Sequence, residues 1–158
     1  MIYLISFYQS NKSFYQNLLM ENLILSLTNL YAVFPYVQYY KKGLYLKASS
    51  ITLAAISSFT YHLIETHKHQ MPGIGIFNDK LSHSIFLNFD RFFAFFAIYQ
   101  CFSLKILNYP YHVIFALSMV FISEVISRLT LYEKNIHVIT HSLWHISVFE
   151  IARLLSLK

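Results

Sequence analysis

Five long apolar stretches constrain the fold of this chain more than any other feature. They cover residues 22–40, 44–65, 84–104, 109–129 and 136–155. A helix needs about 20 apolar residues to cross the hydrocarbon core of a bilayer, and each stretch approaches that length. The connections between stretches are short, except for a polar loop over residues 66–83, so consecutive helices are expected to run antiparallel.

The composition supports a membrane protein made of helices. Hydrophobic residues make up 56% of the 158 residues and charged residues only 12%, whereas a soluble domain carries about 25% charged residues. Three glycines and three prolines leave little material for long loops. The sequence therefore predicts an all-α, polytopic membrane helix bundle of about five transmembrane helices. Residues 1–158 would form a single integral-membrane domain of a multi-pass protein, with membrane lipids as its partners.

Two prolines and one turn refine this prediction. Pro35 is expected to kink the first helix, and Pro110 suits the first turn of the fourth. Lys41, Lys42 and Gly43 predict a tight turn between the first two helices.

Charge and cysteine content exclude two classes of protein. The net charge of +5 is scattered and forms no basic stripe, which excludes a nucleic-acid-binding protein. Cys101 is the single cysteine, so no disulfide framework exists.

Four polar residues from distant parts of the sequence fall at one level of the predicted bundle. Ionisable groups at membrane depth are costly, so they face the bundle interior and need partners. With strict alternation of the five helices, His62 lies near the end of the second helix and Asp90 near the start of the third. His141 and His145 lie near the start of the fifth. At 1.5 Å rise per residue, all four fall within roughly 5–15 Å of the same membrane face. This convergence predicts a site.

The segment HSLWH places His141 and His145 one turn apart on one helix face. Together with His62 they supply three imidazoles, which is the ligand set of a catalytic zinc site with an open fourth position. The alternative for the two histidines of this segment is polar packing between helices, a common use of such residues in membranes.

Three further residues are candidates for supporting roles. Asp90 can orient a water molecule and accept its proton, and Ser58, four residues before His62, can hydrogen-bond a ligand or the substrate oxyanion. The alternative for Ser58 is a hydroxyl that bonds back to its own helix. Glu124 is a candidate for a second-shell bond to a histidine ligand.

The same residues resemble the signature of a known membrane superfamily. The segments SFTYH (58–62), NFDRFFAF (88–95) and HSLWH (141–145) are similar to its ordered Ser-xxx-His, Asp and His-xxx-His motifs. The superfamily includes the alkaline ceramidases, the adiponectin and progestin receptors, the Per1 lipid-remodelling proteins and the myomaker-like proteins. The sequences of the segments SSFTYH and THSLWH are similar to those of the myomaker-like branch.

The resemblance implies a zinc ion held by His62, His141 and His145, with Ser58 and Asp90 beside the catalytic water. It also implies hydrolysis of a lipid amide or ester. Members of the superfamily have seven helices, so this chain would be a shortened relative in which two helices are missing between Asp90 and the final histidine pair. The two missing helices would remove walls of the substrate cavity, whereas the metal site could still assemble.

Two functions therefore follow from the sequence. The first is a zinc-dependent membrane hydrolase that acts on a lipid amide or ester, as the ceramidases do. The second is a non-catalytic, myomaker-like or receptor-like membrane protein with a structural zinc site. A b-type haem protein is disfavoured, because two histidines spaced along one helix cannot bracket a single haem.

Overall fold

The computed structural model describes residues 20–64, 80–101, 104–128 and 134–157 of the chain. All elements within these ranges are helical. Residues 20–28 form a helix that runs directly into a 3₁₀ segment and then into α2. The named elements are η1 (Asn29–Ala32), α2 (Val33–Lys41), α3 (Tyr45–Ile64), α4 (Lys80–Cys101), η3 (Leu104–Asn108), α5 (Pro110–Arg128) and α6 (Lys134–Leu157).

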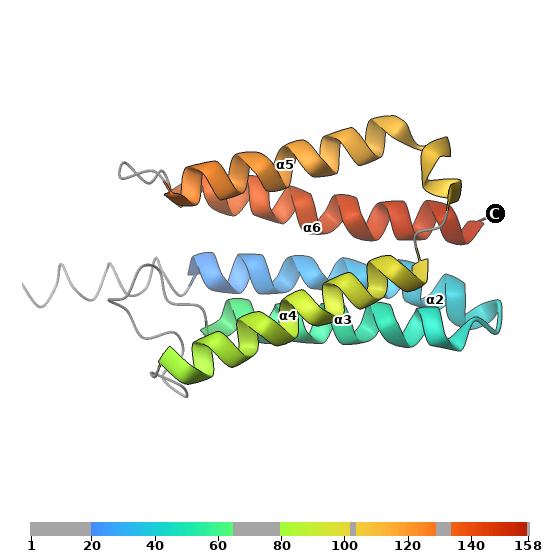
Figure 1. The fold of residues 1–158 in the computed structure, drawn as a ribbon, viewed down its shortest axis with the longest axis horizontal. Coiled ribbons are helices and arrows are strands. Elements are labelled where there is room, and N and C mark those ends of the chain that lie inside the picture. The colour runs from blue at the N-terminus through green and yellow to red at the C-terminus, as the bar shows by residue number, and fades with distance from the viewer. Residues whose placement is uncertain (1–19, 65–79, 102–103, 129–133, 158) are drawn as a thin grey trace, which may run out of the picture.

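The helices form an elongated antiparallel bundle (Figure 1). One pair consists of α3 and α4, and the other of α5 and α6. The N-terminal helix, which continues into α2, lies between the two pairs and contacts both α3 and α6. This helix is therefore the element that joins the two halves of the bundle.

The five helices predicted from the sequence are confirmed, with ends within a few residues of the prediction. The first predicted stretch corresponds to continuous helical structure over residues 20–41. Its 3₁₀ segment ends three residues before Pro35. A proline ring displaces the carbonyl group four residues earlier, which here belongs to Tyr31 within the 3₁₀ segment. Pro110 is the first residue of α5, where its missing N–H group leaves no helical bond unmade.

The predicted turn after α2 forms around Gly43, whose φ angle of 71° lies in the left-handed region. Gly43 N donates to Tyr40 O at 2.9 Å, and Leu44 N donates to Tyr39 O at 3.0 Å. These two bonds make a Schellman motif, which caps the last carbonyl groups of α2. The motif reverses the chain within a few residues, so α3 packs directly back onto α2.

The prediction of membrane-spanning helices was wrong. In the part of the chain that the structure describes, no helix combines enough length with enough apolar character to cross a bilayer. The predicted multi-pass localisation was wrong for the same reason. The physical reason lies in how often polar groups interrupt the apolar stretches. The final helix alone carries His137, His141, His145, Glu150 and Arg153. These polar residues were given too little weight in the prediction from sequence.

The core forms where η1, α2, α3, α4 and α6 meet. It contains several small residues, which let the helix backbones approach closely, and a few large ones that fill the remaining space. Its buried members are Ala32, Tyr39, Ala48, Ile51, Cys101, Phe149 and Ala152. A smaller cluster of Ala116, Ile151 and Leu155 joins α5 to α6.

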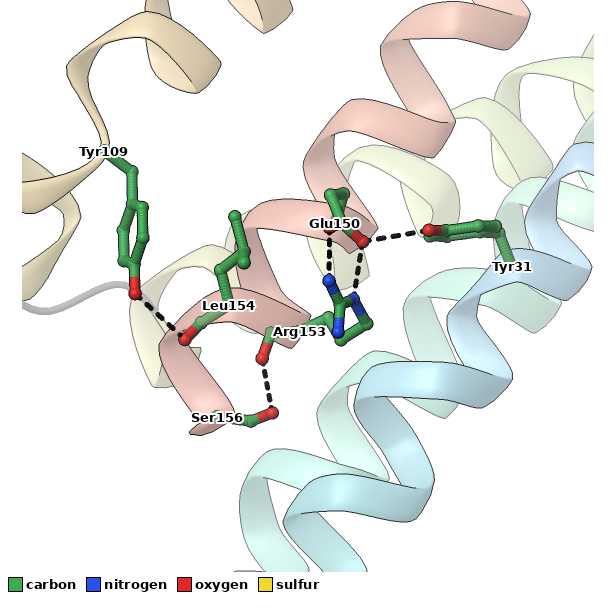
Figure 2. A network of polar contacts seen from close by, with 6 residues as sticks. All are labelled: Tyr31, Tyr109, Glu150, Arg153, Leu154 and Ser156. Atoms are coloured by element: carbon green, nitrogen blue, oxygen red, sulfur yellow. Dashed lines mark hydrogen bonds and ion pairs between the residues drawn. The ribbon is translucent and has the colours of Figure 1, made fainter. Parts of the chain in front are cut away.

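A polar network ties the last turns of α6 to the N-terminal helix (Figure 2). Arg153 donates two bonds to the Glu150 carboxylate, from Nε to Oε2 at 2.7 Å and from Nη2 to Oε1 at 2.6 Å. The Tyr31 hydroxyl donates to Oε2 of the same carboxylate at 2.9 Å. These bonds, above all those from Arg153, lower the pKa of Glu150, and the bond to the carboxylate raises the pKa of Tyr31. The ion pair lies within α6, and the hydrogen bond from Tyr31 joins it to η1.

Two isoleucines of α3 test the position of the core. Ile51 is 1% exposed and Ile56 is 58% exposed. Ile51→Ala should lower the free energy of unfolding by about 2–5 kcal/mol, since it leaves a cavity among well-packed neighbours. The matched control Ile56→Ala should change it by less than about 0.5 kcal/mol. Chemical unfolding followed by circular dichroism measures both, and equal effects would contradict this core.

The Glu150 network predicts a pH-dependent contribution to stability. Because the folded-state pKa of Glu150 is lowered, its stabilising effect is present above the ordinary glutamate pKa and is lost as the pH falls through the folded value. Glu150→Gln should therefore lower the melting temperature at pH 7, and the difference from wild type should narrow on acidification towards pH 4. A difference that stays constant across this pH series would contradict the role of the carboxylate.

Candidate metal centre

Three histidines from two helices meet inside the bundle. His62 lies near the end of α3, whereas His141 and His145 lie one turn apart on α6. The centroid of the His62 ring is 4.8 Å from that of His141 and 5.1 Å from that of His145, and the two α6 rings are 4.7 Å apart. One ring nitrogen from each residue lies within 4.8 Å of the other two. These three side chains are close enough to hold a metal ion.

The cluster is shielded from solvent, and this affects its protonation. His62 is 1% exposed and His145 is 4% exposed, while His141 is half-buried. Burial lowers the pKa of His145 well below its usual value, and the nearby His62 lowers it further. A neutral imidazole keeps a lone pair, which is the form that binds a metal.

The contacts of His145 indicate which of its nitrogens faces the cluster. The Thr28 hydroxyl donates to Leu25 O at 2.6 Å, and Thr28 Oγ1 also lies 2.9 Å from His145 Nδ1. A hydroxyl has only one proton. Because Thr28 uses that proton on the carbonyl, Nδ1 of His145 must be the donor in the second bond. The lone pair of His145 is therefore on Nε2, which is the nitrogen left to act as a ligand.

Ser58 lies beside this nitrogen. Its side chain is 6% exposed, and its Oγ is 3.4 Å from His145 Nε2. Ser58 comes from α3 and His145 from α6, so a side-chain contact between these two helices places the hydroxyl at the site.

Asp90 on α4 lines a cavity of about 60 Å³ together with Ser58 and His145. Most of the remaining wall is apolar and comes from α3, α4 and α6, including Ile51, Ala54, Ala94, Trp144, Val148 and Phe149. The half-buried Asp90 thus lines a mostly apolar space together with one of the clustered histidines.

Glu124, the candidate for a second-shell bond, is exposed on α5. Its neighbour Ser123 contacts the cluster, with Oγ 3.1 Å from His141 Nδ1.

Sequence reasoning missed Thr28, Ser123 and His137. The spacing of His137, four residues before His141, continues the histidine row along one face of α6 and was a usable signal. Thr28 and Ser123 are single hydroxyl residues in other helices, with no motif around them. Their positions follow only from helix packing, which the sequence pattern does not specify.

The donor set fits a transition-metal ion. Zinc in catalytic sites has three protein ligands in a tetrahedral arrangement, with nitrogen ligands at about 2.0–2.1 Å. At that bond length the ligand nitrogens are roughly 3.3 Å apart, so the observed limit of 4.8 Å requires only small rotations of the imidazoles. Imidazole ligands suit zinc, copper, iron and nickel.

The fold and the cluster together define an all-helical protein with a histidine site able to hold a metal. No family model matches this sequence, and no solved structure matches it. The chain is 34% identical over 145 residues to a protein of Acanthamoeba polyphaga mimivirus whose name is "Uncharacterized protein L282". The match covers 82% of this chain and 92% of the viral protein. The chain belongs to the family of this mimivirus protein.

The cluster predicts stoichiometric metal binding that depends on its three histidines. After loading with a divalent transition metal and dialysis, the wild type should retain about one ion per chain, and His62→Ala or His145→Ala should retain far less. His112→Ala is the matched control, because His112 is an exposed histidine of α5. Elemental analysis measures the ratio. Equal retention by the wild type and His145→Ala would contradict the site.

Proposed function

We propose that the protein is a zinc-dependent hydrolase of an acyl amide or ester whose acyl chain is apolar. One observation carries this proposal: His145 belongs both to the histidine cluster and to the wall of the apolar cavity that Ser58 and Asp90 line. A metal held by the cluster would therefore lie beside a hydroxyl group and at the edge of an apolar cavity that a carboxylate also lines.

Zinc is the metal that this donor set favours. Three imidazoles match the histidine-only ligand set of catalytic zinc sites. Zinc in such a site lowers the pKa of water towards about 7 and polarises carbonyl groups. The lowered pKa of His145 supports the same assignment, since the residue stays neutral and able to bind at physiological pH.

The chain's own residues would divide the remaining work between them. The Asp90 carboxylate would accept a proton from a water molecule in the cavity and return it to the leaving group. The Ser58 hydroxyl would donate a hydrogen bond to the substrate carbonyl oxygen. The aliphatic and aromatic wall would contact the part of the acyl chain next to the carbonyl group.

The resemblance to the ceramidase and adiponectin-receptor superfamily supports this reaction. Its ordered residues are Ser58, His62, Asp90, His141 and His145, and the structure brings the three histidines together with Ser58 beside them. The resemblance implies a lipid amide or ester as the substrate, which is consistent with the apolar cavity.

Hydrolysis of synthetic substrates tests the proposal. The zinc-loaded wild type should hydrolyse a fluorogenic N-acyl amide or an acyl ester with a long aliphatic chain, presented in detergent micelles. Asp90→Asn should retain zinc but lose roughly 100-fold or more in kcat/KM, because it removes the proton acceptor.

Ser58→Ala should lower kcat/KM, because it removes the donor to the substrate carbonyl oxygen. Ser57→Ala provides its matched control. The Ser57 hydroxyl bonds back to Ala54 O on its own helix at 3.0 Å, so its removal should leave hydrolysis unchanged. Zinc retention with no hydrolysis of either substrate by the wild type would contradict the proposal and favour a structural zinc site. Full activity in Asp90→Asn would contradict the role given to that carboxylate.

A further inference from the structure

Asn29 of η1 lies in the wall of the apolar cavity and carries a buried polar atom that lacks a donor. The side chain is 2% exposed, and Oδ1 has no hydrogen-bond partner among the residues that the structure describes. Asn29 shares this wall with Ser58, Asp90 and His145. A buried carbonyl oxygen without a donor costs free energy, and folded proteins rarely retain one. Oδ1 of Asn29 is therefore a candidate to accept a hydrogen bond from a molecule bound in the cavity.

The nitrogen of the same side chain identifies the unpaired atom as an acceptor. Asn29 Nδ2 donates to Leu25 O at 3.3 Å. Turning the amide group over would place Oδ1 against this carbonyl oxygen, and two oxygens without a proton form no hydrogen bond. The unpaired atom is therefore the oxygen, and the group that it can bind is an N–H or O–H donor.

Asn29 lies close to the residues proposed to carry out hydrolysis. Thr28, the residue before it, contacts the ring of one clustered histidine. Ser26 donates to Phe59 O at 3.1 Å, and Phe59 follows Ser58 on α3. Asn29 is three residues beyond Ser26, which is roughly 5 Å along a helix. A small group that contacts Ser58 can therefore reach Asn29 within the same cavity.

An amide substrate offers the missing donor, whereas an ester does not. In a planar trans amide, the carbonyl oxygen and the N–H group point in opposite directions. The carbonyl oxygen can then accept from the Ser58 hydroxyl while the N–H group donates to Asn29 Oδ1. An ester has an oxygen in place of the N–H group, so Oδ1 would stay unpaired beside it. A site that hydrogen-bonds an N–H group discriminates against the analogue that lacks it.

We propose that Asn29 is a specificity-determining residue, whose Oδ1 accepts a hydrogen bond from the N–H group of a secondary amide. The residue thereby selects an amide over the matching ester. This inference rests on the proposed hydrolase function and narrows its two substrate classes to one.

Binding to the metal-free protein tests this selection without hydrolysis. Trp144 is the single tryptophan and lines the same cavity, so its fluorescence reports occupancy. Titration with N-butylhexanamide and with butyl hexanoate gives two dissociation constants. The preference for the amide over the ester should fall roughly tenfold from wild type to Asn29→Leu, as expected for one hydrogen bond. An unchanged preference would overturn the inference and indicate that Oδ1 is satisfied by water. Binding of neither compound by the wild type would overturn it too.

The exposed Asn88 of α4 provides the matched control. Asn88→Leu makes the same chemical change and should leave the preference unaltered. Asn29→Leu should also raise the melting temperature of the ligand-free protein, because it removes a buried acceptor that has no partner. If Asn29→Leu fails to fold, Asn29→Ala should show the same fall in preference, and an unaltered preference in that variant would overturn the inference.

Hydrolysis by the zinc-loaded protein separates this inference from the proposed function. Asn29→Leu should lower kcat/KM for the amide relative to that for the ester roughly tenfold. Equal losses for the two compounds would overturn the selection by Asn29 and leave the hydrolase function standing. Hydrolysis of neither compound by the wild type would contradict the hydrolase function, and the binding preference would still decide the role of Asn29.

Discussion

Contact between side chains at the end of α3 and side chains in the first half of α6 is the constraint on which the rest of this structure depends. His62 is almost completely buried there, with its ring against those of His141 and His145. Burial of three imidazoles is costly unless their polar atoms find partners, and here hydroxyl groups from neighbouring helices supply several of them. The N-terminal helix contributes Thr28 and α5 contributes Ser123. Four separate parts of the chain therefore meet around one cluster.

The order of helices along the chain explains why this meeting place exists. Antiparallel neighbours bring the end of α3 and the beginnings of α4 and α6 to the same end of the bundle (Figure 1). His62 lies in the last turn of α3, whereas Asp90 and His145 lie near the middle of α4 and α6, and the metal cluster and the apolar cavity share His145. At the opposite end of α6, the Glu150–Arg153 pair and Tyr31 hold the helix against η1 (Figure 2). The two polar networks thus fix α6 at two levels along its length.

The number of helices and the positions of their ends were predictable, because they depend on the local sequence pattern. The position of the histidines along the bundle was predictable too, because it depends on the alternating direction of the helices. Pro110 and Gly43 set helix ends through their own backbone geometry, and alternation of helices set the depth of His62 and His145. The membrane environment was predicted wrongly, because the length of apolar stretches was given more weight than the hydroxyl, imidazole and charged groups within them. Thr28 and Ser123 could not be predicted, since a single hydroxyl gains its role only from the rotation of one helix against another.

X-ray absorption spectroscopy at the zinc edge of the zinc-loaded protein tests the central claim most directly, because it counts the imidazoles around the ion. The account predicts three histidine nitrogens at about 2.0–2.1 Å and one further light-atom ligand. A spectrum with sulfur scattering, or with one imidazole or none, would contradict a centre built from His62, His141 and His145.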